Sequence, residues 1–435
     1  MTAAILARGI AVLVLAAAAG SLLVVRSGGE LTLEETAGWS LGAGTLLLAC
    51  LYALLLSIHA SPGPRKLGFL LALLAGISVM RRAPGRRTGA PYSGLALALA
   101  GAAAAGIAVY ALQACAEPLW STDFLAIWGL KGKTIHSTGG VPGRLFRDPA
   151  LAWSHPEYPL FVPLLMAAFS AATGGWNDEA LGLVFVLGQI AAVLVVAGYC
   201  RRRGGPRAGA LAAVLVAFWY PLYRAFETGL AEIPFALSLV LLATAAADES
   251  PARSALAALL CVATKQEGTA FALLVAGTLA PRRGASRSSR RAALAIAAVT
   301  ALHGGALLFA RGALHDRDFT FAALAPSRAG ELVGRLGRVA RALVTTGTPA
   351  ELFALACLAG IFLLTRRTRE DFLLIALAAQ VGIYLGACAL SAYDPAWQLR
   401  SAFFRIAATL GPALAVVVGC RLAREATIPA RAAAQ

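Results

Sequence analysis

Long apolar runs separated by short polar segments account for most of the chain. Many of the runs approach about 20 residues, the length of helix that crosses the hydrocarbon core of a bilayer. Helices are expected because an open strand cannot satisfy its backbone hydrogen bonds in lipid. The pattern predicts spans over residues 9–25, 41–58, 94–116, 180–199, 208–222, 233–247, 292–310, 349–364, 372–390 and 406–420. The first run resembles a signal peptide but lacks a convincing A-x-A cleavage site, so we expect a retained helix.

Several apolar stretches do not fit a simple crossing. Residues 67–80 form a short run, which either spans with tilt or lies at the cytoplasmic surface. The proline-containing stretch 158–175 predicts a re-entrant or interfacial helix. Residues 255–264 and 269–280 flank the polar sequence KQEG, where we expect a tight turn at 265–268. A span interrupted by polar residues indicates buried polar groups with a role, because lipid would not tolerate them.

The composition agrees with a membrane protein. Hydrophobic residues make up 59% of the 435 positions and charged residues 14%, whereas about a quarter of a soluble domain is charged. The sequence therefore predicts an all-α, polytopic transmembrane helical bundle of about 11–13 helices. We expect an N-terminal transmembrane module over residues 1–93 and a membrane core over residues 94–435.

The formal net charge of +16 could suggest a nucleic-acid partner. The arginines, however, occur in short clusters between apolar runs, such as RRAPGRR at 81–87 and RRRGGPR at 201–207. Such clusters set orientation and favour anionic lipid headgroups. We therefore expect the lipid bilayer as a partner and no nucleic acid. With the clusters in the cytoplasm, the long loops 117–177 and 311–346 face the opposite side.

The loop 117–177 brings acids, lysines, histidines and tryptophans together directly after an apolar run. Asp123 opens its amphipathic segment DFLAIWGLKGKTIHS, where a span would meet an interfacial helix. A carboxylate there can act as a general base toward an acceptor hydroxyl or ligate a divalent cation. Alternatively Asp123 caps the helix, as Ser121 and Thr122 could also do. The residues expected at the membrane interface are Phe124, Ile127, Trp128 and Leu130.

Lysine occurs at only four positions, and three of them, Lys131, Lys133 and Lys265, fall in predicted outer loops. Lysine is a compact charge that can sit beside a phosphate or a carboxylate. The alternative interpretation is that these lysines are merely solvated or reach toward the membrane surface. Nearby, prolines fix a turn in the sequence HPEYP. This motif contributes His155, Glu157 and Tyr158 as candidate binding residues.

Further charges lie at the same predicted outer level. Glu227 and Glu232 occur in ETGLAEIP, just before the span 233–247. Lys265 and Glu267 occur in TKQEG, where a mutual ion pair within a helix break is the simpler interpretation.

Two arginines, Arg400 and Arg405, border the last predicted span. Arg405 could hold a lipid-linked phosphate through a bidentate contact. The seven cysteines are scattered singly and show no metal-binding spacing, so no cofactor is predicted from them. A divalent cation at Asp123 stays open.

In their order along the chain, these features resemble the GT-C class of membrane glycosyltransferases that use polyprenyl-phosphate sugars. This superfamily includes protein O-mannosyltransferases and lipid A aminoarabinose transferases, and the resemblance covers residues from about 94 to the last span. It is carried by Asp123 after an outgoing span, by Trp128, Lys131 and Lys133, by HPEYPLFVPLL, by ETGLAEIP, by TKQEG, and by Arg405 and Pro412. Many members have paired acids in the first loop, whereas this chain has Asp123 beside Thr122.

The resemblance implies a site on the outer side of the plasma (inner) membrane, facing the periplasm or the cell exterior. Asp123 would be the catalytic acid of the loop, and Glu232 or Glu227 the second acid. Lys265 and Arg405 would bind the donor phosphate. The remaining residues predicted to contact substrate are Trp128, Lys131, Lys133, His155, Glu157, Tyr158, Glu267 and Arg400.

The expected function is therefore transfer of a sugar from a polyprenyl-phosphate donor to a hydroxyl of a glycan, lipid or protein acceptor. Two alternatives come from other classes of protein. Broken helices with intramembrane charges also serve transporters and lipid flippases, although the sequence shows no inverted repeat. The unpaired acid also allows a catalytically degenerate member that acts in assembly.

Overall fold

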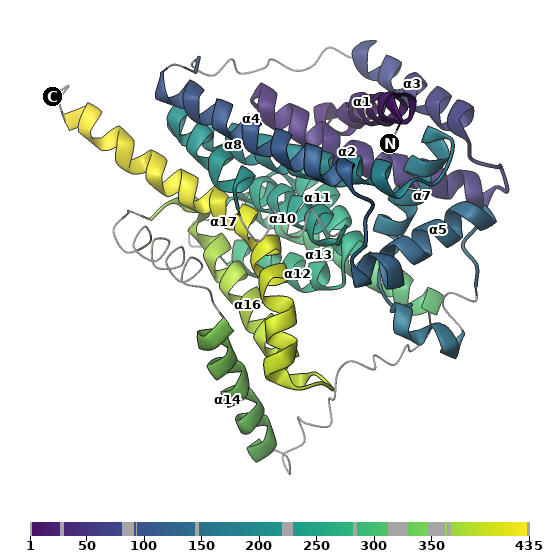
Figure 1. Ribbon diagram of the computed structural model, residues 1–435. Helices are drawn as coiled ribbons and strands as arrows, with labels where there is room; N and C mark the ends of the chain where they lie inside the picture. Colours follow the sequence, from purple (N-terminus) through teal and green to yellow (C-terminus); the bar gives the residue numbers. More distant parts are fainter. Residues whose placement is uncertain are drawn as a thin grey trace.

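The computed structural model describes residues 2–26, 30–80, 91–92, 94–143, 148–219, 229–281, 285–311, 329–346, 362, 365 and 367–432, which form helices and no strand. Figure 1 shows them as one bundle. The helices are α1 Ala3–Arg26, α2 Leu33–Ser57, α3 Pro64–Met80, α4 Leu95–Ala116, η1 Phe124–Trp128, α5 Gly129–Thr138, η2 Pro149–Ser154, α7 Phe161–Thr173, α8 Asp178–Ala217, α10 Glu232–Ala247, α11 Pro251–Thr264, α12 Glu267–Leu279, α13 Arg287–Arg311, α14 Ala329–Thr346, η5 Arg369–Asp371, α16 Phe372–Leu390 and α17 Pro395–Ala432.

Within the part of the chain that the structure describes, six helical segments are long and apolar enough to cross a membrane. They are Ala3–Val24, Leu33–Ser57, Leu95–Ala116, Asp178–Ala217, Arg369–Leu390 and Pro395–Arg424. The all-α class predicted from the apolar runs is therefore confirmed, and the chain has the helices of a multi-pass membrane protein. The predicted span 349–364 lies outside the described residues apart from residue 362.

The segment Asp178–Ala217 is bent back on itself at Gly205. This residue has φ 85° and ψ −179°, a conformation that favours glycine, and Pro206 follows it. Beyond the bend, the chain runs antiparallel to the part before it. Gln189 Nε2 donates a hydrogen bond to the carbonyl of Ala217 at 3.3 Å. The reversal predicted at 201–207 between two apolar runs is thus present.

The N-terminal helices belong to the main core. A Cβ at Gly20 would collide with the carbonyl of Ser40, and one at Gly44 with the carbonyl of Ala16, so α1 and α2 approach closely through small residues. Both helices, with α3, also pack against α7, and the apolar core runs without a break into α8, α10 and α17. Helices on both sides of residue 93 therefore share one apolar core.

Helix α3 packs along α1 over its whole length. Pro64, at its start, lies with Arg8 beside Gly174, and the hydroxyl of Ser78, near its end, contacts that of Ser21. The two helices therefore run in the same direction side by side. This arrangement fits the tilted-span alternative for residues 67–80, because a surface helix would cross the ends of its neighbours.

Helix α7 is short and buried on nearly every side. Its 13 residues span about 20 Å at 1.5 Å per residue, too little for a full crossing. An interfacial helix would leave one face exposed. The re-entrant alternative predicted for 158–175 therefore fits the structure better.

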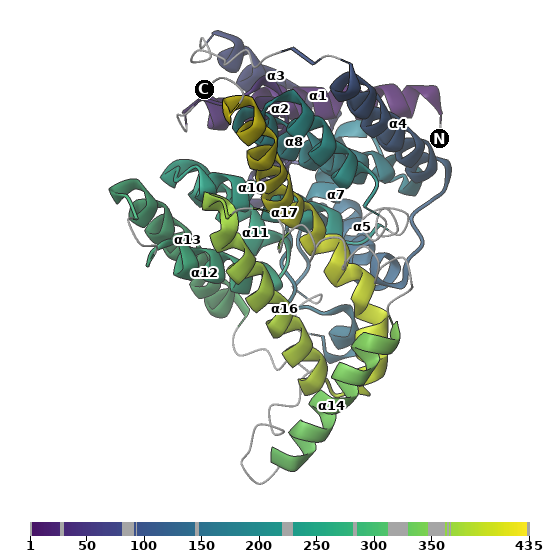
Figure 2. The same ribbon diagram turned by 90° about the vertical axis from the view of Figure 1, so that its left-hand side faces the viewer.

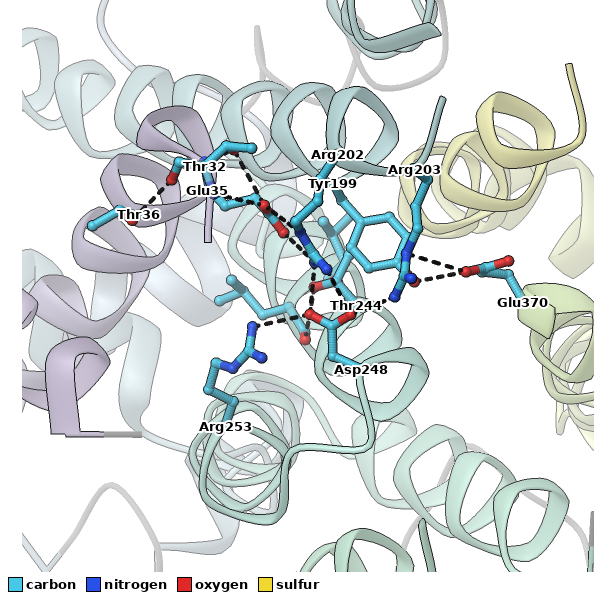
Figure 3. A network of polar contacts seen from close by, with 12 residues as sticks. Thr32, Glu35, Thr36, Tyr199, Arg202, Arg203, Thr244, Asp248, Arg253 and Glu370 are labelled. Carbon is cyan, nitrogen blue, oxygen red and sulfur yellow. Dashed lines mark hydrogen bonds and ion pairs between the residues drawn. The ribbon is translucent and has the colours of Figure 1, made fainter. Parts of the chain in front are cut away.

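Charged side chains gather at one end of the bundle in what we call the Arg202 layer (Figure 3). Arg202 binds Glu35 of α2 at 2.7 Å and Asp248 at the end of α10 at 2.7 Å. Arg203, Arg253 and Arg369 also pair with the Asp248 carboxylate, at 2.7–3.3 Å. Further members of the layer are Glu34, Tyr199, Arg201, Glu370, Asp371 and Arg421.

Asp248 is the centre of this layer. Burial raises the pKa of its carboxyl, but the charges and hydrogen bonds of Arg202, Arg253 and Arg203 outweigh burial and hold the pKa below its usual value. The carboxylate thus neutralises arginines from α8, α11 and η5. Because these helices come from distant parts of the sequence, one side chain ties together the end of the bundle.

We expect Asp248→Asn to lower the free energy of unfolding by about 3 kcal/mol, because removing one partner of a buried ion pair leaves the other charges uncompensated. Thermal denaturation of the purified protein in detergent measures the change. Asp394→Asn is the matched control. Its pair with Arg338 at 4.0 Å is more than half exposed on both sides, and exposed pairs contribute about 0–1 kcal/mol. Equal midpoints for the two variants would contradict the assigned role of Asp248.

Candidate functional site

A second group of charges, the Arg405 layer, lies at the opposite end of the same helices. It consists of Asp123, Glu232, Lys265, Glu267 and Arg405. On α10, Glu232 opens the helix and Asp248 closes it. Sixteen residues correspond to about 24 Å along a helix, close to the roughly 30 Å hydrocarbon thickness of a bilayer. The same spacing separates Arg405 from Arg421 on α17, so apolar helix lies between two charged layers.

The Arg405 layer is a chain of alternating charges. The Glu232 carboxylate accepts from Lys265 Nζ at 3.0 Å and from Arg405 Nε at 2.7 Å. Arg405 Nη2 reaches Asp123 Oδ2 at 2.8 Å, and Lys265 Nζ reaches Glu267 Oε1 at 3.1 Å. Glu232 is completely buried, whereas the side chains of Asp123 and Glu267 are 25% and 31% exposed. The central anion is therefore enclosed and the two outer acids border solvent-accessible space.

A cavity of about 190 Å³ opens beside these charges. It lies between the α11–α12 turn, the C-terminal part of α16 and the N-terminal part of α17. Both cations of the layer line it, together with polar groups from the neighbouring helices. The polar side chains in its wall are Tyr158, Glu232, Lys265, Gln266, Glu267, Tyr384, Gln398, Arg405 and Thr409.

The turn that presents Lys265 is the one predicted from KQEG. Helix α11 ends at Thr264, and Lys265 follows in an extended conformation before α12 begins at Glu267. At the opposite end of α11 and α12, the hydroxyl of Ser288 at the start of α13 donates a hydrogen bond to the carbonyl of Glu249, which precedes α11 and follows Asp248, at 2.6 Å. Helices α11 and α12 therefore form a hairpin whose turn lies in the Arg405 layer, which confirms the prediction. The ion pair expected between Lys265 and Glu267 is also present.

Asp123 is not the cap of its helix. Ser121 takes that role, because its hydroxyl accepts a hydrogen bond from the Phe124 amide at 3.0 Å. Asp123 makes no capping hydrogen bond, and its carboxylate pairs with Arg405 instead. A short π-helix, η1, follows directly, a feature that is often found at functional sites.

The residues expected at the membrane interface are inside the protein. Phe124, Ile127 and Trp128 are buried, and Leu130 is half-buried. Trp128 stacks on Tyr158 with ring centroids 5.3 Å apart. The interfacial prediction was therefore wrong, because the amphipathic face packs back onto the HPEYP loop instead of turning toward lipid.

Lys131 and the HPEYP loop form a support next to the cavity. Lys131 is completely buried, and its ammonium group donates a hydrogen bond to the backbone carbonyl of His155. The His155 ring stacks on Tyr158 at 4.7 Å, and its Nδ1 lies 2.8 Å from Glu157 Oε1. Gln266 donates to the carbonyl of Glu157 at 3.1 Å, which joins the loop to the α11–α12 turn. These contacts position Tyr158 in the cavity wall.

Glu157 is ionised in this setting. Burial raises the pKa of its carboxyl. The hydrogen bond and the charge of His155, together with the charge of Lys131, lower the pKa by more than burial raises it, so the pKa lies below its usual value. His155 itself has φ 51°, an uncommon conformation for a residue other than glycine. The Lys131 contact to its carbonyl is one interaction that holds this conformation.

The structure does not bring every predicted residue to the cavity. Lys133 and Arg400 are exposed and do not line it. Asp123 is not in its wall either and reaches it through the ion pair with Arg405. The other predicted residues outside the wall are Trp128, Lys131, His155 and Glu157. Glu227 lies outside the described residues. Tyr384, Gln398 and Thr409 were missed. A single polar residue within an apolar run, such as Tyr384 or Thr409, gives no pattern that identifies its neighbours, and Gln398 does not stand out in the polar segment 391–405.

The described side chains include no group of three or more His, Cys, Asp or Glu that could hold a metal ion. Comparisons with family models, curated proteins and solved structures found no match for this chain. The site is therefore interpreted from its own geometry.

We expect Lys131→Met to loosen the HPEYP loop while leaving the helices intact, because methionine keeps most of the packing volume but cannot donate to the His155 carbonyl. Hydrogen–deuterium exchange of the amides of His155, Glu157 and Tyr158 should become at least about tenfold faster, the effect of losing roughly 1.4 kcal/mol of local stability. Lys133→Met, at an exposed position two residues away, should leave exchange unchanged. Protection equal to that of the parent protein in Lys131→Met would show that this contact is dispensable.

Proposed function

We propose that the chain is an integral-membrane glycosyltransferase that moves a sugar from a polyprenyl-phosphate donor to an acceptor hydroxyl. One observation supports this proposal above the others. Two cations, Lys265 and Arg405, line one cavity and share a buried anion, Glu232, while their other acidic partners remain partly exposed. A phosphate group can replace those partly exposed acids while Lys265 and Arg405 both keep their contacts with Glu232.

Binding of the donor phosphate would use this exchange. The Glu232 carboxylate is enclosed, so it stays as the fixed partner of Lys265 and Arg405. The phosphate oxygens take the place of Asp123 at Arg405 and of Glu267 at Lys265. Arg405 offers a planar, always charged group for this purpose and Lys265 a compact one. The layer carries three carboxylates and two cations, so displacement of the outer acids is required before an anion gains net attraction.

The displaced Asp123 then becomes available for proton transfer. Its carboxylate would accept the proton of the acceptor hydroxyl as the acceptor oxygen bonds to the anomeric carbon. The bond between the anomeric carbon and the phosphate oxygen breaks, and the polyprenyl phosphate leaves with the electron pair. Negative charge develops on that phosphate, where Lys265 and Arg405 stabilise it. Inversion at the anomeric carbon is proposed from the family resemblance alone.

The distribution of arginine supports an orientation for this site. Arginines of α8, α11, η5 and α17 meet in the Arg202 layer, and clustered arginine marks the cytoplasmic side of membrane proteins. The Arg405 layer would then face the periplasm or cell exterior of the plasma (inner) membrane. The lipid-linked donor would enter from the bilayer, and a glycan, lipid or protein acceptor from the aqueous side.

The same ion pairs also allow a second function. In the absence of an anion, Asp123 and Glu267 already neutralise both cations. A catalytically inactive protein could keep this network as a structural lock and act in assembly, and a flippase could use it to bind a lipid phosphate. These alternatives predict no bond cleavage.

Asp123→Asn should reduce sugar transfer at least about 100-fold, the lower end of the range for loss of a general base, because the amide keeps the size of the side chain but cannot accept the proton. Transfer from a radiolabelled polyprenyl-phosphate sugar pool in membranes measures the effect, normalised to the amount of inserted protein. Asp394→Asn, at an exposed acid directly before α17, is the control and should retain full transfer. Equal transfer by Asp123→Asn would remove Asp123 from the proposed mechanism.

Glu267→Gln should behave differently from Asp123→Asn although both acids pair with a cation of the cavity. In the proposed mechanism Glu267 is only displaced, so its loss should leave the turnover number within about threefold of the parent protein's value. KM for the donor should fall, because one competing anion is removed. Steady-state kinetics over a range of donor concentrations separates the two effects. A loss of turnover as large as that of Asp123→Asn would contradict the division of roles between these acids.

A further inference from the structure

Helix α14 has three distinct faces. One is buried against α16 and α17 and includes Val339 and Ala342, each 3% exposed. A second face is apolar and exposed, with Val333 68% and Val344 73% accessible. The helical spacing of three or four residues places the remaining members of this face, Leu336, Ala340 and Leu343, in the same stripe.

The third face of α14 is polar. Glu331, Arg338, Arg341 and Thr345 recur at helical spacing and are all exposed. On a helical wheel this stripe lies roughly opposite the exposed apolar stripe. A helix on the surface of a soluble assembly would direct the apolar stripe inward. In α14 a separate face, with Val339 and Ala342, packs against the bundle. The exposed apolar stripe therefore points to surroundings other than water, such as lipid.

The position of α14 at the end of the bundle is fixed by Arg335. Its Nε donates to the carbonyl of Ala389 at 2.5 Å, and its Nη2 donates to the carbonyls of Ser391 and Tyr393. These carbonyls belong to the C-terminal end of α16 and the turn into α17, where α16 offers no backbone N–H to bind them. Figure 2 shows α14 beyond the ends of α16 and α17, crossing them at an angle.

The neighbouring surface carries the residues of a membrane boundary. Tyr393 in the α16–α17 turn and Trp397 in the first turn of α17 are about half exposed, with ring centroids 5.6 Å apart. Exposed tyrosine and tryptophan are enriched where protein passes from hydrocarbon to headgroups. Arg338 and Arg341 add positive charge with Glu331 as the one acid of the polar stripe. Amphipathic helices of this charge bind anionic headgroups while their apolar stripe enters the acyl chains.

We propose that α14 lies in the leaflet at the Arg405 end of the bundle, with Val333, Leu336 and Leu343 in the acyl chains and Arg338 and Arg341 among the headgroups. Through Arg335 it holds the α16–α17 turn at the bilayer surface. That turn leads directly into the part of α17 that lines the cavity, so the membrane surface sets the height of the cavity mouth. The inference does not depend on which reaction the cavity performs.

The experiment is spin-label accessibility in vesicles of phosphatidylethanolamine and phosphatidylglycerol. A nitroxide is placed at position 336 or 343 for the apolar stripe and at 338 or 341 for the polar stripe, through an unnatural amino acid that leaves the seven cysteines in place. All four positions are exposed, so the labels need not disturb packing. Collision with oxygen reports lipid, and collision with a water-soluble nickel chelate reports solvent.

We expect labels at 336 and 343 to collide at least about fivefold more with oxygen, relative to the nickel chelate, than labels at 338 and 341. A nickel-dominated signal at 336 and 343 would mean that the stripe faces water and would overturn the proposal. Protection from both reagents would mean that protein covers the stripe and would overturn it equally. Vesicles lacking phosphatidylglycerol provide a further measurement, in which the depth of the 336 label should decrease.

Discussion

A completely buried carboxylate, Glu232, determines how the Arg405 end of the molecule is built. An anion in an apolar interior is tolerated only with close counter-charges, and Lys265 and Arg405 supply them at 3.0 and 2.7 Å. These partners come from the α11–α12 turn and from α17. Neutralising one side chain therefore brings three distant segments to one level and places two cations in the wall of the same cavity.

The Arg202 layer meets the same constraint at the other end. Asp248 closes α10 as Glu232 opens it, and both acids draw cations from several helices. Between the two layers α10 and α17 are mostly apolar. Glu232 is enclosed, whereas Asp123 and Glu267 are partly exposed, as the proposed exchange with an incoming anion requires.

The sequence predicted what periodicity and composition control. Apolar runs located the helices, and the polar KQEG break located the α11–α12 turn and its lysine. Apart from the pair of Lys265 and Glu267, which are two residues apart in the sequence, side-chain partners could not be predicted, because they depend on tertiary packing. The amphipathic segment after Asp123 was assigned to the membrane interface, yet Trp128 stacks on Tyr158 and Lys131 binds the His155 carbonyl inside the protein. The predicted outer loop 311–346 likewise contains α14, and Arg335 is held there by backbone carbonyls that no pattern reveals.

The central claim is that the cavity cleaves a sugar–phosphate bond, and phosphorus NMR tests it most directly. The purified protein is reconstituted in vesicles with a panel of polyprenyl-phosphate sugars and short acceptor alcohols. The account predicts that at least one donor's phosphodiester signal converts to the phosphate monoester of the free polyprenyl carrier, and that Arg405→Gln abolishes the conversion. A donor that binds or crosses the bilayer while every phosphodiester signal persists would contradict the account and favour a flippase or an assembly component.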